Sequence, residues 1–144
     1  MLARTFRGVP LLSIVLCCCL LLLGASACAS RVEPIYNVVN HPVSSAAQRL
    51  PLQEIGHVIA TAAADYHWSV VRSGPGQLRA TYERGSHEAV IAISYSKSAY
   101  SINLVSSEDL KQHDGEIHRK YNEWIHNLER AIEERLDAAA VALK

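Results

Sequence analysis

The sequence is poor in the residues on which several functional classes depend. Its 144 residues include one phenylalanine, one methionine and four cysteines, and fourteen acidic residues balance the fourteen basic ones. There is no basic patch of the kind that nucleic-acid binding requires, so no nucleic-acid partner is expected. There is no G-x-S-x-G motif, so a serine nucleophile on a strained elbow is not expected either. The sequence predicts a protein that is not an enzyme and has no cofactor or resident metal.

One short apolar segment lies near the start of the chain. Arg4 and Arg7 precede a largely apolar stretch of 15 residues, 9–23, which is followed by small residues and then by Cys28. A basic, then apolar, then small-residue order is that of a secretory signal. A membrane-spanning helix needs about 20 apolar residues, so we expect cleavage after Ala27, and a retained signal anchor is the alternative.

The residues at the predicted cleavage site carry a more specific signal. Ala25-Ser26-Ala27-Cys28 resembles the lipobox of bacterial lipoproteins, in which the cysteine is acylated and becomes the new N-terminus. In that family a residue other than aspartate after the cysteine, here Ala29, implies sorting to the outer membrane. The resemblance implies lipidation at Cys28 and a protein that faces the periplasm. The other cysteines, at positions 17–19, would leave with the signal, so no disulfide is expected within the mature chain.

The composition of residues 28–144 predicts a linker followed by a single domain. Residues 28–144 hold twelve basic and fourteen acidic residues, a formal net charge of −2. Two prolines and a polar run predict a linker over residues 29–50, in which Ile35–Val39 could add an edge strand. As a coil, such a tether spans about 25 Å. We therefore expect a signal peptide over 1–27, a lipidated N-terminus and linker over 28–50, and a single domain over 51–144.

Hydrophobic periodicity predicts the fold of that domain. Apolar residues recur at helical spacing from Pro51 to about His67 and again from Ile117 to Leu136, with Asp114 as the expected N-cap of the second helix. Four β-prone segments lie between the helices, near residues 68–72, 78–83, 89–95 and 100–104. Short turns between such segments are typical of an antiparallel meander. A sheet with one apolar face must be covered, so we predict an α+β two-layer sandwich with both helices on one face.

The segment from Trp68 to Leu128 resembles a group of small proteobacterial lipoproteins. The resemblance rests on residues 87–95 and 100–102, on Ser107 and Leu110, and most specifically on Gly115-Glu116-Ile117-His118 with Tyr121-Asn122 and Trp124-Ile125. It implies the fold and the envelope location of the chain, and it brings no activity with it.

Histidines are the candidate ligands in the predicted domain. His87, His113 and His118 could hold a metal ion or a small ligand, because neutral imidazole is a common metal ligand. The alternative is that His118 hydrogen-bonds the preceding loop. Asn122 is expected to cap or bridge the loop at residues 106–114, and the aromatic residues of the same helix are expected to pack in the core.

The leading prediction is a lipid-anchored accessory or protein-binding module of the bacterial cell envelope. Its partners would be the membrane, through acylated Cys28, and an envelope protein. The outer face of the sheet is the expected contact surface, carrying Arg79, Thr81, Glu83 and Asn103. The alternatives are a small-ligand or metal-binding lipoprotein that uses its surface histidines, and a subunit of an envelope hydrolase.

Overall fold

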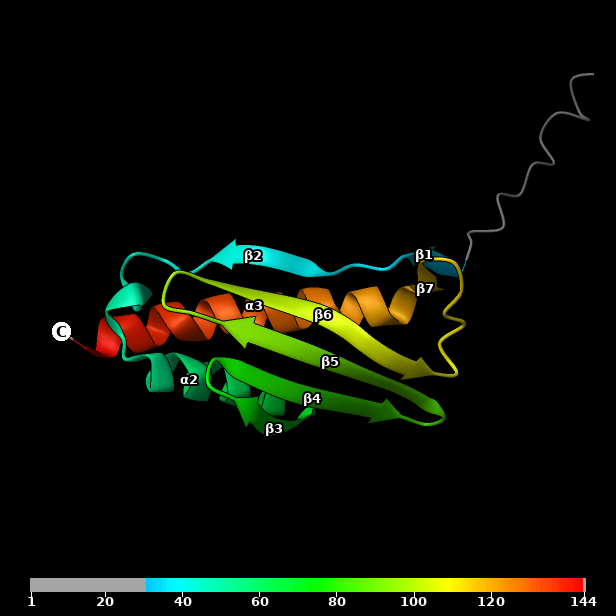
Figure 1. Cartoon of the computed structure of the whole chain (residues 1–144), viewed down its shortest axis with the longest axis horizontal. Coiled ribbons are helices and arrows are strands. Elements are labelled where there is room, and N and C mark those ends of the chain that lie inside the picture. The colour runs from blue at the N-terminus through cyan, green and yellow to red at the C-terminus, as the bar shows by residue number, and fades with distance from the viewer. Residues whose placement is uncertain (1–30, 144) are drawn as a thin grey trace, which may run out of the picture. The chain divides into compact units, whose positions relative to one another are not determined.

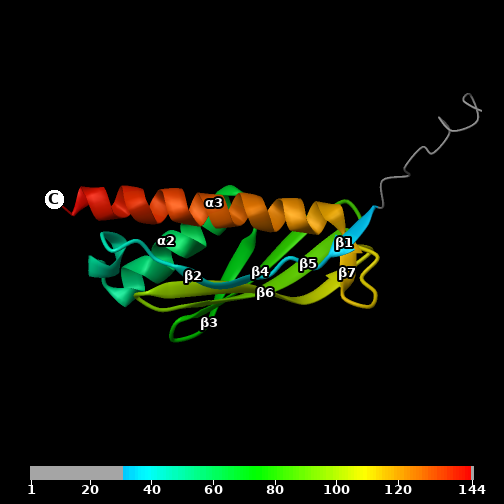
Figure 2. The ribbon, with the colours of Figure 1, turned by 90° about the horizontal axis from the view of Figure 1, so that it is seen from above.

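The computed structural model describes residues 31–143, so the predicted signal and Cys28 lie outside the described residues. The elements in chain order are β1 (Val32–Pro34), β2 (Val38–Pro42), the 3-10 helix η1 (Ala47–Arg49), α2 (Leu52–Asp65), β3 (Ser69–Gly74), β4 (Gln77–Arg84), β5 (His87–Tyr95), β6 (Ala99–Glu108), β7 (Glu116–His118) and α3 (Arg119–Ala142). Both long helices lie on one side of the sheet (Figures 1 and 2). The predicted α+β sandwich is confirmed.

The main sheet has five antiparallel strands in the order β2-β6-β5-β4-β3. Along β5 the side chains of Ala89, Ile91, Ile93 and Tyr95 are buried, while Ala92 and Ser94 between them are exposed. Since successive side chains of a strand point to opposite faces, one face of the sheet is apolar. The helices cover this face, as Figure 2 shows from above.

The predicted apolar stripe of α3 forms much of the core. Tyr121, Trp124, Ile125 and Leu128 are all buried, so the two aromatic residues pack in the core as expected. Tyr82 on β4 places its ring 4.6 Å from that of Trp124, measured between centroids. The core thus joins the sheet to the C-terminal helix.

The described part of the predicted linker belongs to the domain, and the boundary at residue 51 is wrong. β2 pairs with β6, and Val38, Val43, Ala47 and Leu50 are buried in the core. The apolar residues of this segment are spaced irregularly, and the segment packs against elements far along the chain, so neither helical nor alternating periodicity revealed it. The expected edge strand is present, but it covers Val38–Pro42 and not Ile35–Val39.

The C-terminal helix starts five residues after its predicted N-cap. Asp114 and Gly115 have positive φ angles of 47° and 82°, and a bridge pairs His113 with Glu116 across them. An Asp-Gly pair in the left-handed region is the preferred turn of a two-residue hairpin. Asp114 therefore forms part of a hairpin turn and does not cap the helix. The residues after the turn form β7, which pairs with β1.

Candidate functional site

The structure brings together two of the three predicted ligand histidines. His87 begins β5 and His118 ends β7, and their rings stack with centroids 5.9 Å apart. His113 is exposed in the preceding loop, where its Nε2 lies 3.1 Å from a carboxylate oxygen of Asp114. Within residues 31–143 these histidines do not take part in a cluster of three donor atoms close enough for one metal ion.

His118 acts as the N-cap of α3. Its Nδ1 accepts a hydrogen bond from the backbone N–H of Lys120 at 3.2 Å, which satisfies one of the free donors at the helix start. Burial of the ring lowers the pKa of His118, and the neighbouring His87 acts in the same direction. The contact with the preceding loop is made by the backbone and not by the ring, because the N–H of His118 donates to the carbonyl of Leu110 at 2.8 Å.

A serine, a histidine and an aspartate meet near the same end of the sheet without forming a triad. The hydroxyl of Ser86 donates directly to Asp109. Nδ1 of His87 lies 3.8 Å from the same carboxylate oxygen. In a hydrolytic triad the imidazole lies between the hydroxyl and the acid, so this arrangement gives no support to the hydrolase alternative.

Asn122 on α3 holds the N-terminal segment in place. Its Oδ1 accepts a hydrogen bond from the backbone N–H of Tyr36 at 3.0 Å, and its Nδ2 donates to the carbonyl of Pro34 at 2.9 Å. The prediction that Asn122 contacts the loop at residues 106–114 is therefore wrong. Its partners lie nearly ninety residues earlier in the sequence, a separation for which the local pattern around Asn122 gives no signal.

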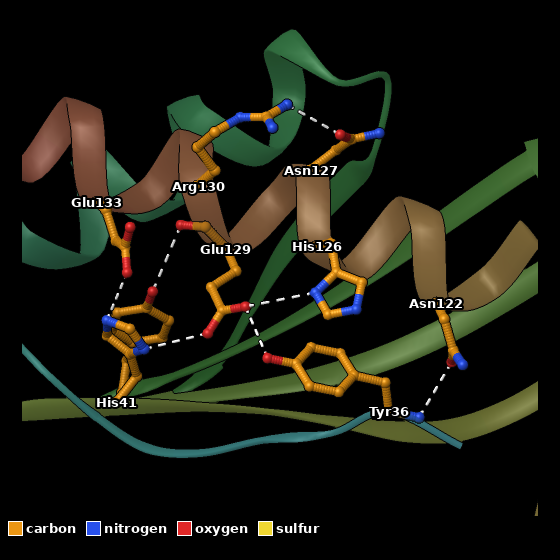
Figure 3. A network of polar contacts seen from close by, with 9 residues as sticks. Tyr36, His41, Asn122, His126, Asn127, Glu129, Arg130 and Glu133 are labelled. Atoms are coloured by element: carbon orange, nitrogen blue, oxygen red, sulfur yellow. Dashed lines mark hydrogen bonds and ion pairs between the residues drawn. The ribbon is translucent and has the colours of Figure 1, made fainter. Parts of the chain in front are cut away.

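A cluster of polar side chains lies between β2 and α3 (Figure 3). Nδ1 of His41 is 3.1 Å from Oε1 of Glu129, and Nε2 of His41 is 2.6 Å from Oε1 of Glu133. One donor atom from each of the three residues lies within 4.8 Å of the other two. We call His41, Glu129 and Glu133 the histidine–glutamate cluster; in the described part of the chain it is the single set of His, Cys, Asp or Glu residues with this spacing.

Local backbone geometry explains how the cluster forms. Glu129 and Glu133 are four residues apart on α3, so they lie on one face of the helix. In β2 the pairing with β6 shifts register between Val38 and His41, and Asn40 adopts a positive φ of 49°. Strict alternation from buried Val38 would place His41 on the outer face. The extra residue of the bulge turns it toward α3, as bulges commonly do.

Further contacts hold Glu129 in place. The hydroxyl of Tyr36 donates to its Oε2 at 2.8 Å, and Nδ1 of His126 lies 3.9 Å from the same atom. The rings of Tyr36 and His126 lie side by side with centroids 4.0 Å apart (Figure 3). Burial raises the pKa of Tyr36 to about 12, and its hydrogen bond to Glu129 acts in the same direction. The tyrosine therefore remains a hydrogen-bond donor to Glu129 at neutral pH.

A pocket of about 250 Å³ opens beside the cluster. Its lining residues are His41, Pro42, Val43, Ser44, Tyr100, Glu133, Leu136 and Asp137. Asp137 continues the acidic face of α3 one turn beyond Glu133, and its Oδ1 accepts a hydrogen bond from Ser44 at 2.6 Å. Both His41 and Glu133 therefore border a space that a water molecule or a small ligand can enter.

The cluster has an excess of hydrogen-bond acceptors. A neutral imidazole carries one N–H, so His41 can donate to both glutamates only when it is protonated. Among residues 31–143, no lysine or arginine forms an ion pair with Glu129 or Glu133. The arrangement therefore calls for a positive charge at this position, either a proton on His41 or a bound cation.

This cluster is not apparent from the sequence, because His41 falls in the segment for which a linker is predicted. One signal was present, the i,i+4 spacing of Glu129 and Glu133 on a predicted helix. Its histidine partner comes from a strand almost ninety residues away. No local pattern connects the two.

The predicted protein-contact residues share the outer face of the main sheet. Arg79 on β4 pairs with Ala92 on β5, which pairs with Asn103 on β6, so that they form one row across three strands. Thr81 and Glu83 occupy the next two outward positions of β4. A hollow of about 300 Å³ opens here and is lined by residues of these strands, including Arg79, Ala92 and Asn103.

Three glutamates form a second row on this outer face. Glu83 on β4 is directly opposite Glu88 on β5, and Glu88 is directly opposite Glu108 on β6. No ion pair with a basic side chain is formed by any of the three within the described residues. Like charges directly opposite each other destabilise a sheet, so this row lowers the stability of the fold.

Comparisons with known proteins do not identify a family for this chain. No protein-family model, curated protein or solved structure matches it. The resemblance to small lipoproteins stays a prediction. Neither of the described long helices combines the length and the apolar character needed to cross a membrane.

Proposed function

We propose that the chain is a lipid-anchored accessory module of the bacterial cell envelope, which faces the periplasm and binds a partner protein through the outer face of its main sheet. The observation that supports this most directly is the placement of the helices. Both α2 and α3 cover one face of the sheet, and within residues 31–143 no helix covers the other face, which we call the open face (Figure 2).

The open face has the mixed character of a transient protein interface. It carries polar and charged side chains such as Arg79 and Asn103 together with the exposed apolar residues Val71 and Val105. Interfaces of this kind are about as polar as the rest of a protein surface. The shape of the face is also suitable, because the sheet presents a broad surface with a shallow hollow.

The glutamate row indicates the chemistry of the partner. Carboxylates that face each other across two strands destabilise a sheet, and Glu83, Glu88 and Glu108 make two such pairs. A partner that presents lysine or arginine side chains to this row relieves the repulsion when it binds. We therefore propose a basic surface on the partner protein.

The anchor sets where this binding takes place. Two residues lie between Cys28 and Arg31, where the described domain begins. The three Cα–Cα steps from Cys28 to Arg31 span at most about 11 Å. With Cys28 acylated, the domain is held close against its membrane and the partner is met there. This distance replaces the longer tether expected from a linker over residues 28–50.

Site-specific crosslinking in living cells tests the proposed surface. A photoreactive amino acid at Thr81 or Asn103 should give the same adduct, while one at Glu134 on the exposed side of α3 should give none. Adducts of equal yield at all three positions, or at none, contradict the assignment of the outer face.

The triple variant Glu83→Gln, Glu88→Gln, Glu108→Gln separates stability from binding. Removing both repulsive pairs should raise the free energy of unfolding. The crosslink at Thr81 should be lost in the same variant, because the basic partner has lost its counter-charges. An adduct that persists at wild-type yield would show that the row takes no part in binding.

The anchor is tested separately by mass spectrometry of the N-terminus of the protein isolated from membranes. We expect an acylated Cys28 in the wild type, and release of the domain from the membrane in Cys28→Ser. An intact segment over residues 1–27 would instead establish the retained anchor.

A further inference from the structure

We propose that the histidine–glutamate cluster is a binding site for one divalent zinc ion, with a ring nitrogen of His41 and one oxygen each from Glu129 and Glu133 as ligands. This site is distinct from the histidines that the sequence suggested. It lies on the helix side of the sheet and does not depend on the proposed partner surface.

The donor atoms favour zinc over the harder cations. Calcium and magnesium are bound in proteins almost entirely by oxygen, whereas zinc commonly combines imidazole nitrogen with carboxylate oxygen. The cluster offers one nitrogen and two carboxylates, with one atom of each residue within 4.8 Å of the others. Three protein ligands leave one position of a tetrahedral ion open, as in zinc sites that hold water.

One carboxylate has to move for the three residues to bind a single ion. Zinc bonds of about 2.0–2.1 Å place tetrahedral ligand atoms about 3.4 Å apart. The contacts of 3.1 and 2.6 Å are made by opposite ring nitrogens of His41, Nδ1 to Glu129 and Nε2 to Glu133. One of these nitrogens binds the ion, so the carboxylate that faces the other nitrogen has to move. Because one donor atom of each residue already lies within 4.8 Å of the others, bringing these atoms to about 3.4 Å from one another requires a change of up to about 1.4 Å. Glu133 is free to move because 45% of its side-chain surface is exposed, and the neighbouring pocket gives space for the fourth ligand.

The residues around the cluster are arranged as the supporting groups of a metal site. The second oxygen of Glu129 accepts a hydrogen bond from Tyr36, which fixes the orientation of the carboxylate. Such outer contacts raise metal affinity by holding ligands in place. Asp137 lines the adjacent pocket and adds negative charge near the ion. A dication also supplies the positive charge that the two glutamates lack.

Isothermal titration calorimetry of zinc into the full chain in detergent micelles tests the site. The four cysteines at positions 17, 18, 19 and 28 are replaced by serine so that thiolates do not compete. We expect one zinc ion per chain, with magnesium showing no heat of binding. The dissociation constant should rise at least about tenfold in His41→Ala and in Glu133→Gln, and about tenfold in Tyr36→Phe.

His57→Ala is the matched control, because His57 is exposed on α2 and lies outside the cluster. Its zinc affinity should equal that of the parent chain. Glu133→Gln changes an exposed side chain, so it reports on binding even where His41→Ala alters folding.

Three results overturn the proposal. They are no binding at micromolar zinc, unchanged affinity in both His41→Ala and Glu133→Gln, and loss of binding in His87→Ala or His118→Ala instead. X-ray absorption at the zinc edge gives an independent check, since the first shell should contain nitrogen and oxygen with one imidazole.

Discussion

Replacing Asn122 by alanine should weaken the whole domain, because this side chain joins α3 to the segment before β2. The amide is buried, with 7% of the residue exposed. It accepts from the N–H of Tyr36 and donates to the carbonyl of Pro34, at 3.0 and 2.9 Å. The alanine variant leaves both backbone groups without their partner.

The expected magnitude follows from these two bonds. A buried polar group that loses its partner destabilises the fold by about 1–3 kcal/mol. Tyr36 is only half-buried and Pro34 is exposed, so water can replace part of what both backbone groups lose. We therefore expect Asn122→Ala to lower the free energy of unfolding by about 1–3 kcal/mol.

Two further variants make the measurement specific. Asn122→Asp keeps the acceptor for the N–H of Tyr36 but places a carboxylate oxygen against the carbonyl oxygen of Pro34. Because these two oxygens repel each other, the variant should be at least as destabilised as Asn122→Ala near neutral pH. Asn127→Ala on the same helix is the control, because its amide oxygen accepts from the exposed side chain of Arg130. It should change stability by less than about 0.5 kcal/mol.

Urea denaturation gives the comparison. The midpoint should fall in Asn122→Ala with an unchanged slope, which identifies a change in stability and not in compactness. The backbone N–H of Tyr36 should also exchange with solvent faster. If Asn122→Ala is no less stable than Asn127→Ala, the segment before β2 is not held by this side chain and the reasoning fails.

Two further predictions concern packing and pH. Gly56→Ala should destabilise the domain by about 1–3 kcal/mol in urea unfolding, because the added Cβ would overlap the buried ring of Tyr95. Gly74→Ala is the control, because a Cβ at this position contacts no other group, and its free energy of unfolding should stay near that of the wild type. The pKa of His118 is lowered by burial and then by His87. The unfolded state therefore takes up the proton first, and stability should decline as pH falls below about 6.5. This decline should be shallower in His118→Gln, and equal slopes between pH 7 and 5 would contradict the shift.

The sequence predicts well those features that depend on neighbouring residues. Alternation along residues 78–82, 89–95 and 100–104 specified which side chains of β4, β5 and β6 enter the core, because a strand exposes successive residues to opposite faces. The 3.6-residue period specified the buried stripe of α3 in the same way. Each of these patterns is complete within one segment.

The features that were missed depend on residues far apart in the chain. β1 pairs with β7, and β2 pairs with β6, over separations of more than fifty residues. His41 meets Glu129 only after a bulge has changed the direction of its side chain. The predicted start of α3 is wrong because Asp114-Gly115 fits two local patterns, a helix N-cap at Asp114 and the turn of a two-residue hairpin. The hairpin forms because it allows β7 to pair with β1. Tertiary contacts decided each case.

The contacts between the first strands and α3 have a consequence for how the chain is made. Ribosomes release residues 31–42 long before residues 119–142, yet Asn122 and Glu129 supply the partners of Pro34, Tyr36 and His41. The early segment therefore cannot complete its packing until synthesis is nearly finished. Contacts of such long sequence separation also slow folding. The export that we propose for this chain would benefit from such a delay, because a chain has to stay unfolded while it crosses a membrane.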